Sequence, residues 1–255
     1  MGAEYCCRSA SFKKSLLRSS SPTYKKKFFG YAISMKYKGV IFDLDGTLVD
    51  TISDIAASMN KALEKHGFPS LETEAYRDKV GWGIRRLAAL CILHCSYAEP
   101  FDIEMKAAAV AETALSFYSE EPLLHSKPYP GIKELVAELR NRKIKTAVLT
   151  NKPHKTAQLV VAGLFPQDFF SFVRGEVFGN PRKPDPASVW ELLVDMDLSP
   201  ADIVFTGDSE VDMETAVSSG CFPLGVSWGY RSREAIIGSG ARHIIESPEE
   251  LLDFF

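Results

Sequence analysis

The fold is decided at residues 40–48, which read VIFDLDGTL. This stretch begins as an apolar run and ends in two carboxylates, Asp43 and Asp45, with one residue between them. Side chains at positions i and i+2 of a strand lie on the same face, and Gly46 then permits a sharp turn. If the strand is a central one of a parallel sheet, both acids emerge at its carboxyl end, where open α/β sheets place their active sites.

Later stretches place further polar residues at the ends of predicted strands. Thr150 and Asn151 follow the apolar run at 146–149, and Asp208 follows the predicted strand at 203–206. Lys183 stands in a loop that is stiffened by prolines on its carboxyl side. Taken singly, the Thr-Asn pair is typical of a strand-end turn, and most lysines are solvated surface charges. Only the ordered set indicates a site.

In this order the stretches resemble the motifs of the haloacid dehalogenase superfamily of phosphatases. The motif positions are DLDGT at 43–47, VLTNK at 148–152, RKPDP at 182–186 and VFTGDSEVD at 204–212. The resemblance extends from Met35 to the C-terminus and is strongest to phosphoglycolate phosphatase-like hydrolases, through TNKP at 150–153 and GVSWGY at 225–230. It implies a Rossmann-like parallel sheet with helices on both faces and an inserted all-helical cap domain.

Phosphoryl transfer gives the two acids of the first motif different roles. The reaction needs a nucleophile, a proton for the leaving alkoxide, and positive charge around the phosphoryl oxygens. Asp43 is the candidate nucleophile, because carboxylates form aspartyl-phosphate intermediates. Asp45 is the candidate general acid, and later the base that activates water.

Several acids around an anionic substrate require a cation, and oxygen ligands favour Mg2+. The resemblance implies three protein ligands, which are the Asp43 carboxylate, the Asp45 backbone carbonyl and the Asp208 carboxylate. Asp212 lies one helical turn after Asp208 and is expected to orient a water molecule or Lys183 from behind the metal. The alternative for Asp208 and Asp212 is that they cap the N-terminus of a helix.

The same motifs supply candidates for phosphate binding. The Thr150 hydroxyl and an N–H of Asn151 are expected to donate hydrogen bonds to phosphate oxygens. The Lys183 ammonium is expected to act on them as a point charge.

Helical periodicity fills residues 52–124 without a convincing strand, which predicts a helical cap between the first two strands. Residues 35–51 and 125–255 are then expected to form the catalytic α/β core, because strands and helices alternate there. The cap is expected to set substrate choice. Within it, Arg85 is the candidate contact to a remote carboxylate or phosphate, and the alternative is an exposed arginine in a helix–helix turn.

The composition predicts an ordinary globular chain, with 45% hydrophobic residues and a net charge of -3. Basic residues are concentrated in the first 36 positions, so the remainder is acidic, which argues against nucleic-acid binding. No apolar stretch approaches the roughly 18 residues of a membrane span. We therefore expect a cytoplasmic monomer or homodimer whose partner is a small phosphorylated metabolite.

Residues 1–34 form a basic, Ser-rich extension that is expected to be disordered. Three interpretations remain open for it. It is a dispensable stretch upstream of a start at Met35, an organellar targeting segment, or a functional basic tail.

The sequence predicts a Mg2+-dependent phosphomonoester hydrolase, with 2-phosphoglycolate as the expected substrate. A sugar phosphomutase of the same superfamily, a pyrophosphatase and a generalist sugar-phosphate phosphatase remain alternatives. Asp45 argues against a dehalogenase or a phosphonate hydrolase, neither of which needs that acid, and Thr47 favours hydrolysis over mutase activity. A phosphate-binding regulator without activity is the alternative outside the enzymes.

Overall fold

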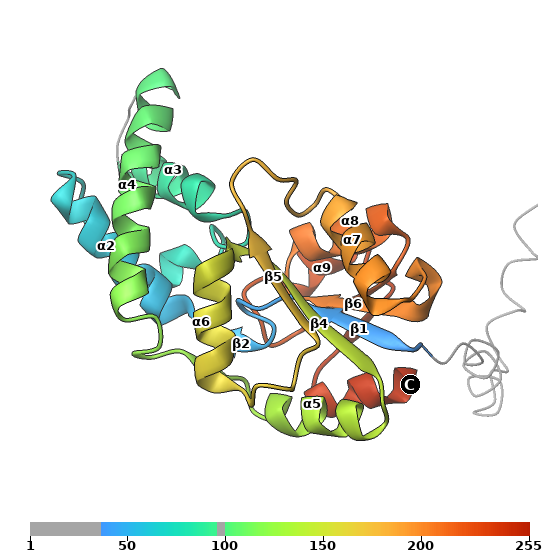
Figure 1. Ribbon diagram of the computed structural model, residues 1–255. Helices are drawn as coiled ribbons and strands as arrows, with labels where there is room; N and C mark the ends of the chain where they lie inside the picture. The colour runs from blue at the N-terminus through green and yellow to red at the C-terminus, as the bar shows by residue number, and fades with distance from the viewer. Residues whose placement is uncertain (1–36, 96–99) are drawn as a thin grey trace, which may run out of the picture. The chain divides into compact units, whose positions relative to one another are not determined.

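A computed structural model describes residues 37–95 and 100–255, so the predictions for residues 1–34 lie outside the described residues. Six strands form one sheet in the order β5-β4-β1-β6-β7-β8, and every neighbouring pair is parallel. Figure 1 labels β5, β4, β1 and β6 of this sheet. In that order the strands are β5 (Phe172–Glu176), β4 (Lys145–Pro153), β1 (Gly39–Phe42), β6 (Ile203–Gly207), β7 (Phe222–Val226) and β8 (His243–Ile245).

Strand β1 lies inside the sheet, and its apolar residues serve both faces. Val40 and Phe42 belong to one hydrophobic cluster and Ile41 to another, as the alternation of a strand requires. Helices α5 (Ile132–Asn141) and α6 (His154–Leu164) contribute to the first cluster, and α7 (Ala187–Met196) and α8 (Glu210–Ser219) to the second. An uninterrupted apolar run is typical of a strand covered on both faces. The structure confirms the predicted α/β class.

The described residues between 51 and 126 form helices joined by turns and loops, and they contain no strand. They form α2 (Ile52–Lys65), the 3-10 helix η1 (Thr73–Tyr76), α3 (Ile84–Cys95) and α4 (Pro100–Glu120). Helices α2 and α3 both pack on α4, and the three stand together in Figure 1. We refer to these residues as the helical insertion. None of the described helices is both long enough and apolar enough to cross a bilayer.

A short antiparallel pair joins the two chain crossings between the sheet and the helical insertion. Strand β2 (Val49–Asp50) pairs with β3 (Lys127–Pro128), which the sequence analysis did not predict. Asp54, in the first turn of α2, adds polar contacts to this junction. Its buried carboxylate accepts hydrogen bonds from the backbone N–H groups of His125 and Ser126 and from the Ser126 hydroxyl. The start of α2 is thus fastened to the segment that leaves the insertion.

A capping box begins the last helix of the chain. The sequence pattern at residues 247–250 predicts a capping box, and Ser247 and Glu250 form one. The helix that follows, η3 (Pro248–Phe254), is a 3-10 helix. The remaining elements are the 3-10 helix η2 (Pro200–Asp202) and the short α-helix α9 (Arg233–Gly238).

We expect Asp54→Ala to lower the free energy of unfolding by about 2–4 kcal/mol, because it leaves buried N–H groups of the junction without an acceptor. Denaturant unfolding measures this change. Asp54→Asn keeps one acceptor oxygen and should lose less. Ser53→Ala alters an exposed residue of the same turn and is the matched control, with an expected change within about 0.5 kcal/mol. Equal stability of Asp54→Ala and Ser53→Ala would contradict a fastening role for Asp54.

Candidate active site

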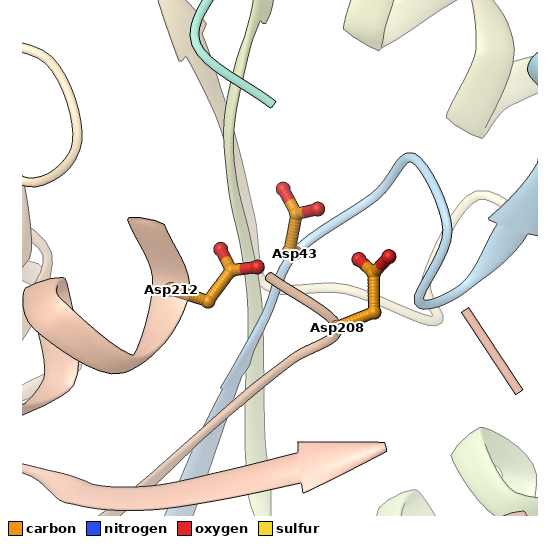
Figure 2. A group of neighbouring side chains, drawn as sticks. All are labelled: Asp43, Asp208 and Asp212. Carbon is orange, nitrogen blue, oxygen red and sulfur yellow. The ribbon is translucent and has the colours of Figure 1, made fainter. Parts of the chain in front are cut away.

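The site lies at the carboxyl edge of the sheet, where three neighbouring strands bring their polar residues together. Asp43 directly follows β1, Asp208 directly follows β6, and Thr150 lies in β4, which flanks β1 on its other side. Asp212 comes from the first turn of α8. Carboxylate oxygens of Asp43, Asp208 and Asp212 lie within 4.8 Å of one another, and Figure 2 shows the three side chains gathered there.

The turn after β1 is shaped around Asp208. Gly46 has a φ of +91°, and a Cβ atom at this position would collide with the Asp208 carboxylate. The Thr47 hydroxyl donates to one Asp208 oxygen at 3.1 Å, and the Tyr230 backbone N–H donates to the other at 2.7 Å. Gly46 and Thr47 of the first motif therefore fix the position of Asp208, the acid of the fourth motif.

Lys183 binds two of the three acids. Its Nζ donates to Asp43 Oδ1 and to Asp212 Oδ1, each at 2.6 Å, and its side chain is only 3% exposed. The other Asp212 oxygen accepts from the backbone N–H and the hydroxyl of Ser209, which makes a capping box at the start of α8. Asp212 therefore caps the helix and holds Lys183 at the same time, so the two interpretations of this acid are compatible.

Burial of these acids makes their negative charge costly. It raises the pKa of Asp43 well above its ordinary value, although the Lys183 ammonium opposes the shift. Burial, together with the Asp212 carboxylate, raises the pKa of Asp208 to about 7. A bound cation would relieve this repulsion, and the donor set consists of carboxylate oxygens, which suit a hard divalent ion. The residues present therefore fit Mg2+.

Asp45 lies in a second charged pair. Its Oδ1 accepts from the Thr51 hydroxyl at 2.7 Å, and Lys152 Nζ lies 3.0 Å from Oδ1 and 3.3 Å from Oδ2. The Lys152 side chain is 5% exposed. Burial acts to lower the pKa of Lys152, but Asp45 and Tyr118 outweigh burial, and the pKa is raised above its ordinary value. Sequence reasoning missed Lys152 as a site residue, and its only signal was its place in TNKP.

The two residues of β4 that are predicted to bind phosphate, Thr150 and Asn151, have side chains in different surroundings. Thr150 lines the cavity beside the acids. The side-chain amide of Asn151 instead donates to the backbone carbonyls of Gly81 and Lys183, both at 3.0 Å. Asn151 thus joins a loop of the helical insertion to the loop that carries Lys183. Phosphate contacts by Thr150 and by the Asn151 backbone stay predictions.

A cavity of about 70 Å3 lies between the sheet edge and the helical insertion. Asp43, Asp45 and Lys152 line its floor. The insertion supplies mainly apolar walls, which include Ile55, Met59, Ile84, Leu87, Leu115 and Tyr118. This small volume favours a small ligand.

Arg85 does not line this cavity. Its guanidinium lies 5.2 Å from the centre of the Phe178 ring, and that of Arg86 lies 4.2 Å from the Trp82 ring. The predicted contact between Arg85 and substrate is therefore not visible in this arrangement, and it stays a prediction.

Arg231 is a further residue that sequence reasoning missed. Its Nε donates to Glu210 at 2.9 Å, and its other nitrogens donate to the backbone carbonyls of Arg77 and Val80 in the helical insertion. The side chain is 8% exposed. Arg231 and Asn151 together fasten residues 77–83 to the sheet side of the cavity. No local pattern in the sequence distinguishes this arginine from a surface one.

Comparison with known proteins places these features in a family. The model of the haloacid dehalogenase-like hydrolase family matches residues 40–226. The phosphoglycolate phosphatase of Vibrio vulnificus strain CMCP6 is 31% identical over 216 residues, which cover 85% of this chain and 95% of the relative. That of Mannheimia succiniciproducens is 31% identical over 221 residues, with 86% and 99% covered.

A crystal structure from Lactobacillus delbrueckii subsp. bulgaricus, provisionally named a phosphoglycolate phosphatase, has a TM-score of 0.79 and 30% identity. The match covers 85% of this chain and 97% of that one. The chain belongs to the haloacid dehalogenase-like hydrolase family, which confirms the predicted family, the α/β fold and the phosphatase class of enzyme.

Proposed function

We propose that the chain is a Mg2+-dependent phosphomonoester hydrolase that acts on a small phosphorylated metabolite through an aspartyl-phosphate on Asp43. The preferred substrate is 2-phosphoglycolate. One observation carries the proposal: the buried Asp43 carboxylate lies at the end of an inner strand, opens to the cavity, and is held by Lys183. The names of the relatives support the substrate.

The reaction begins when an Asp43 oxygen attacks phosphorus in line with the ester oxygen. The bond between phosphorus and the ester oxygen breaks, and Asp45, in its protonated form at this step, donates its proton to the leaving alkoxide and becomes a carboxylate. Thr51 and Lys152 hold the Asp45 side chain in place for this transfer. Lys183 and Thr150 supply a cation and a hydroxyl for the phosphoryl oxygens.

The second half of the reaction releases phosphate. Asp45 accepts a proton from a water molecule whose oxygen attacks phosphorus, and the bond to Asp43 breaks. Inorganic phosphate leaves, and both acids return to their starting state. The helical insertion covers the cavity and limits the access of bulk water to the intermediate.

The metal would be held by the carboxylates of Asp43 and Asp208 and by the backbone carbonyl of Asp45, with Asp212 behind them. When bound, Mg2+ supplies positive charge that offsets the repulsion between these acids and the phosphate dianion.

We expect Asp43→Asn to lower kcat by about 10^3-fold or more, because an amide does not replace the nucleophilic carboxylate. Steady-state phosphate release measures the loss. When the wild type turns over substrate whose phosphoryl group is radioactive, acid quenching should trap labelled protein. The variant should trap none. Asp185→Asn changes an exposed acid near Lys183 and is the matched control. A rate close to that of the wild type in Asp43→Asn would refute the mechanism.

Mg2+ should stabilise the protein, because it relieves repulsion among buried acids. At a hundredfold excess over its Kd, binding contributes about 2.7 kcal/mol, which corresponds to a rise in Tm of about 5 °C or more. Since the pKa of Asp208 is about 7, Mg2+ must displace a proton at about pH 6 but not at about pH 8. The rise should therefore be larger at the higher pH.

Thermal unfolding with Mg2+ and with chelator tests this expectation without an activity assay. Asp208→Asn should reduce the shift, whereas Asp185→Asn should preserve it. The absence of any Mg2+-dependent shift in the wild type at either pH would contradict a metal site at these acids.

Initial rates of phosphate release should identify the substrate. We expect kcat/KM for 2-phosphoglycolate to exceed that for pyrophosphate, β-glucose 1-phosphate and other sugar phosphates by about tenfold or more. Chelator should abolish the activity. A flat profile would indicate a generalist phosphatase, and conversion of β-glucose 1-phosphate to glucose 6-phosphate would indicate a mutase.

A further inference from the structure

The charges that line the cavity are unevenly distributed. Among the described residues that line it, Asp43 and Asp45 are the acids and Lys152 is the one cation. The described residues of the helical insertion contribute no charged group to the lining, and Arg85 and Arg86 lie against aromatic rings instead. A substrate with a second negative charge therefore meets one positive side chain in this cavity, and that side chain belongs to strand β4.

Lys152 is rigidly placed for such a contact. It follows Thr150 and Asn151 on β4, and its side chain is almost fully buried. An ammonium group has three N–H donors, and Asp45 is the acid that Lys152 Nζ contacts, at 3.0 and 3.3 Å. Nζ also lies 4.3 Å from the centre of the Tyr118 ring. Capacity therefore remains on Nζ for an acceptor that enters the cavity.

Tyr118 supplies an independent observation. This residue of α4 lines the same cavity and is 5% exposed. Its hydroxyl lies close to Lys152 and Ser126 but makes no hydrogen bond of ordinary geometry with any described residue. A buried hydroxyl without a partner is unfavourable, so its presence beside an ammonium group indicates a missing acceptor.

We infer that Lys152 and Tyr118 together bind a carboxylate of the substrate, attached directly to the carbon that bears the ester oxygen. The inference rests on the proposed function, because it adds a second contact to the same substrate. A carboxylate accepts hydrogen bonds from both groups at once, which pairs the ammonium charge and satisfies the hydroxyl.

The length of the substrate follows from the position of Lys152. Its Nζ lies 3.0 Å from the Asp45 oxygen, and Asp45 is the group proposed to protonate the ester oxygen. A second anion that reaches Lys152 must therefore lie close to the ester oxygen. The walls around Met59 and Leu87 are mainly apolar and offer few hydrogen bonds to the hydroxyl groups of a sugar. A short phosphorylated hydroxy acid fits these constraints better than a sugar phosphate.

A matched pair of substrates tests the inference. Ethyl phosphate has the skeleton of 2-phosphoglycolate, with a methyl group in place of the carboxylate. The wild type should prefer 2-phosphoglycolate in kcat/KM by about tenfold or more. Lys152→Met should reduce this preference to within about threefold, and Tyr118→Phe should reduce it in part. Lys152→Arg keeps a cation and should retain more of the preference than Lys152→Met.

The ratio of the two substrates separates recognition from support of Asp45. Loss of Lys152 also disturbs Asp45, but that loss affects both substrates equally and cancels in the ratio. Equal losses with an unchanged ratio in Lys152→Met would therefore overturn the inference and leave the phosphatase intact. A loss of preference in Arg85→Ala but not in Lys152→Met would also overturn it, and would assign the carboxylate to Arg85.

Three further outcomes are decisive. If Lys152→Met does not fold, the test rests on the wild type and on Tyr118→Phe. A wild-type ratio of kcat/KM between 2-phosphoglycolate and ethyl phosphate near unity would overturn the inference. So would a ratio in Tyr118→Phe that equals that of the wild type. If the wild type hydrolyses neither ester but releases phosphate from other substrates, the proposed substrate is wrong and the inference falls with it. If it hydrolyses no phosphoester, the proposed function itself fails.

Discussion

The site depends on one buried ammonium group, that of Lys183, which lies between Asp43 and Asp212. Through it, the end of β1, the loop before α7 and the first turn of α8 are fixed relative to one another. Three buried carboxylates would otherwise repel, and their burial alone is costly. Because removal of one partner leaves the others uncompensated, the positions of these segments are interdependent.

The strand order explains why this charge cluster forms from distant parts of the chain. Strands β4 and β6 flank β1 in a parallel sheet, so residues far apart in sequence reach one edge. The apolar alternation of Val40, Ile41 and Phe42 anchors β1 between two helical layers. The rigid core thus fixes the acids, whereas side chains such as Asn151 and Arg231 determine how the helical insertion lies over them.

Much of this arrangement was predictable, because it follows from backbone periodicity. The strands and the helical stretch after residue 51 follow from apolar runs and helical periodicity, whereas the grouping of Asp208 and Asp212 with Asp43 was expected from the resemblance to the family. The partners of long polar side chains were not predictable. Lys152 is buried against an acid more than a hundred residues away in the sequence. No physical pattern in the sequence around it distinguishes it from a lysine exposed to solvent, because the contact forms only in the packed structure.

The position of the pair formed by Asp45 and Lys152 bears on how the protein selects its substrate. Lys152 belongs to the sheet, next to Thr150, whereas Tyr118 belongs to the helical insertion. A substrate carboxylate held by both would contact two parts of the chain, and that contact is complete only when the insertion covers the cavity. Binding energy from the carboxylate would then favour the covered state in which Asp45 is shielded from water. Esters that lack the carboxylate forgo this contribution, so recognition of the substrate and exclusion of water are coupled through the same two side chains.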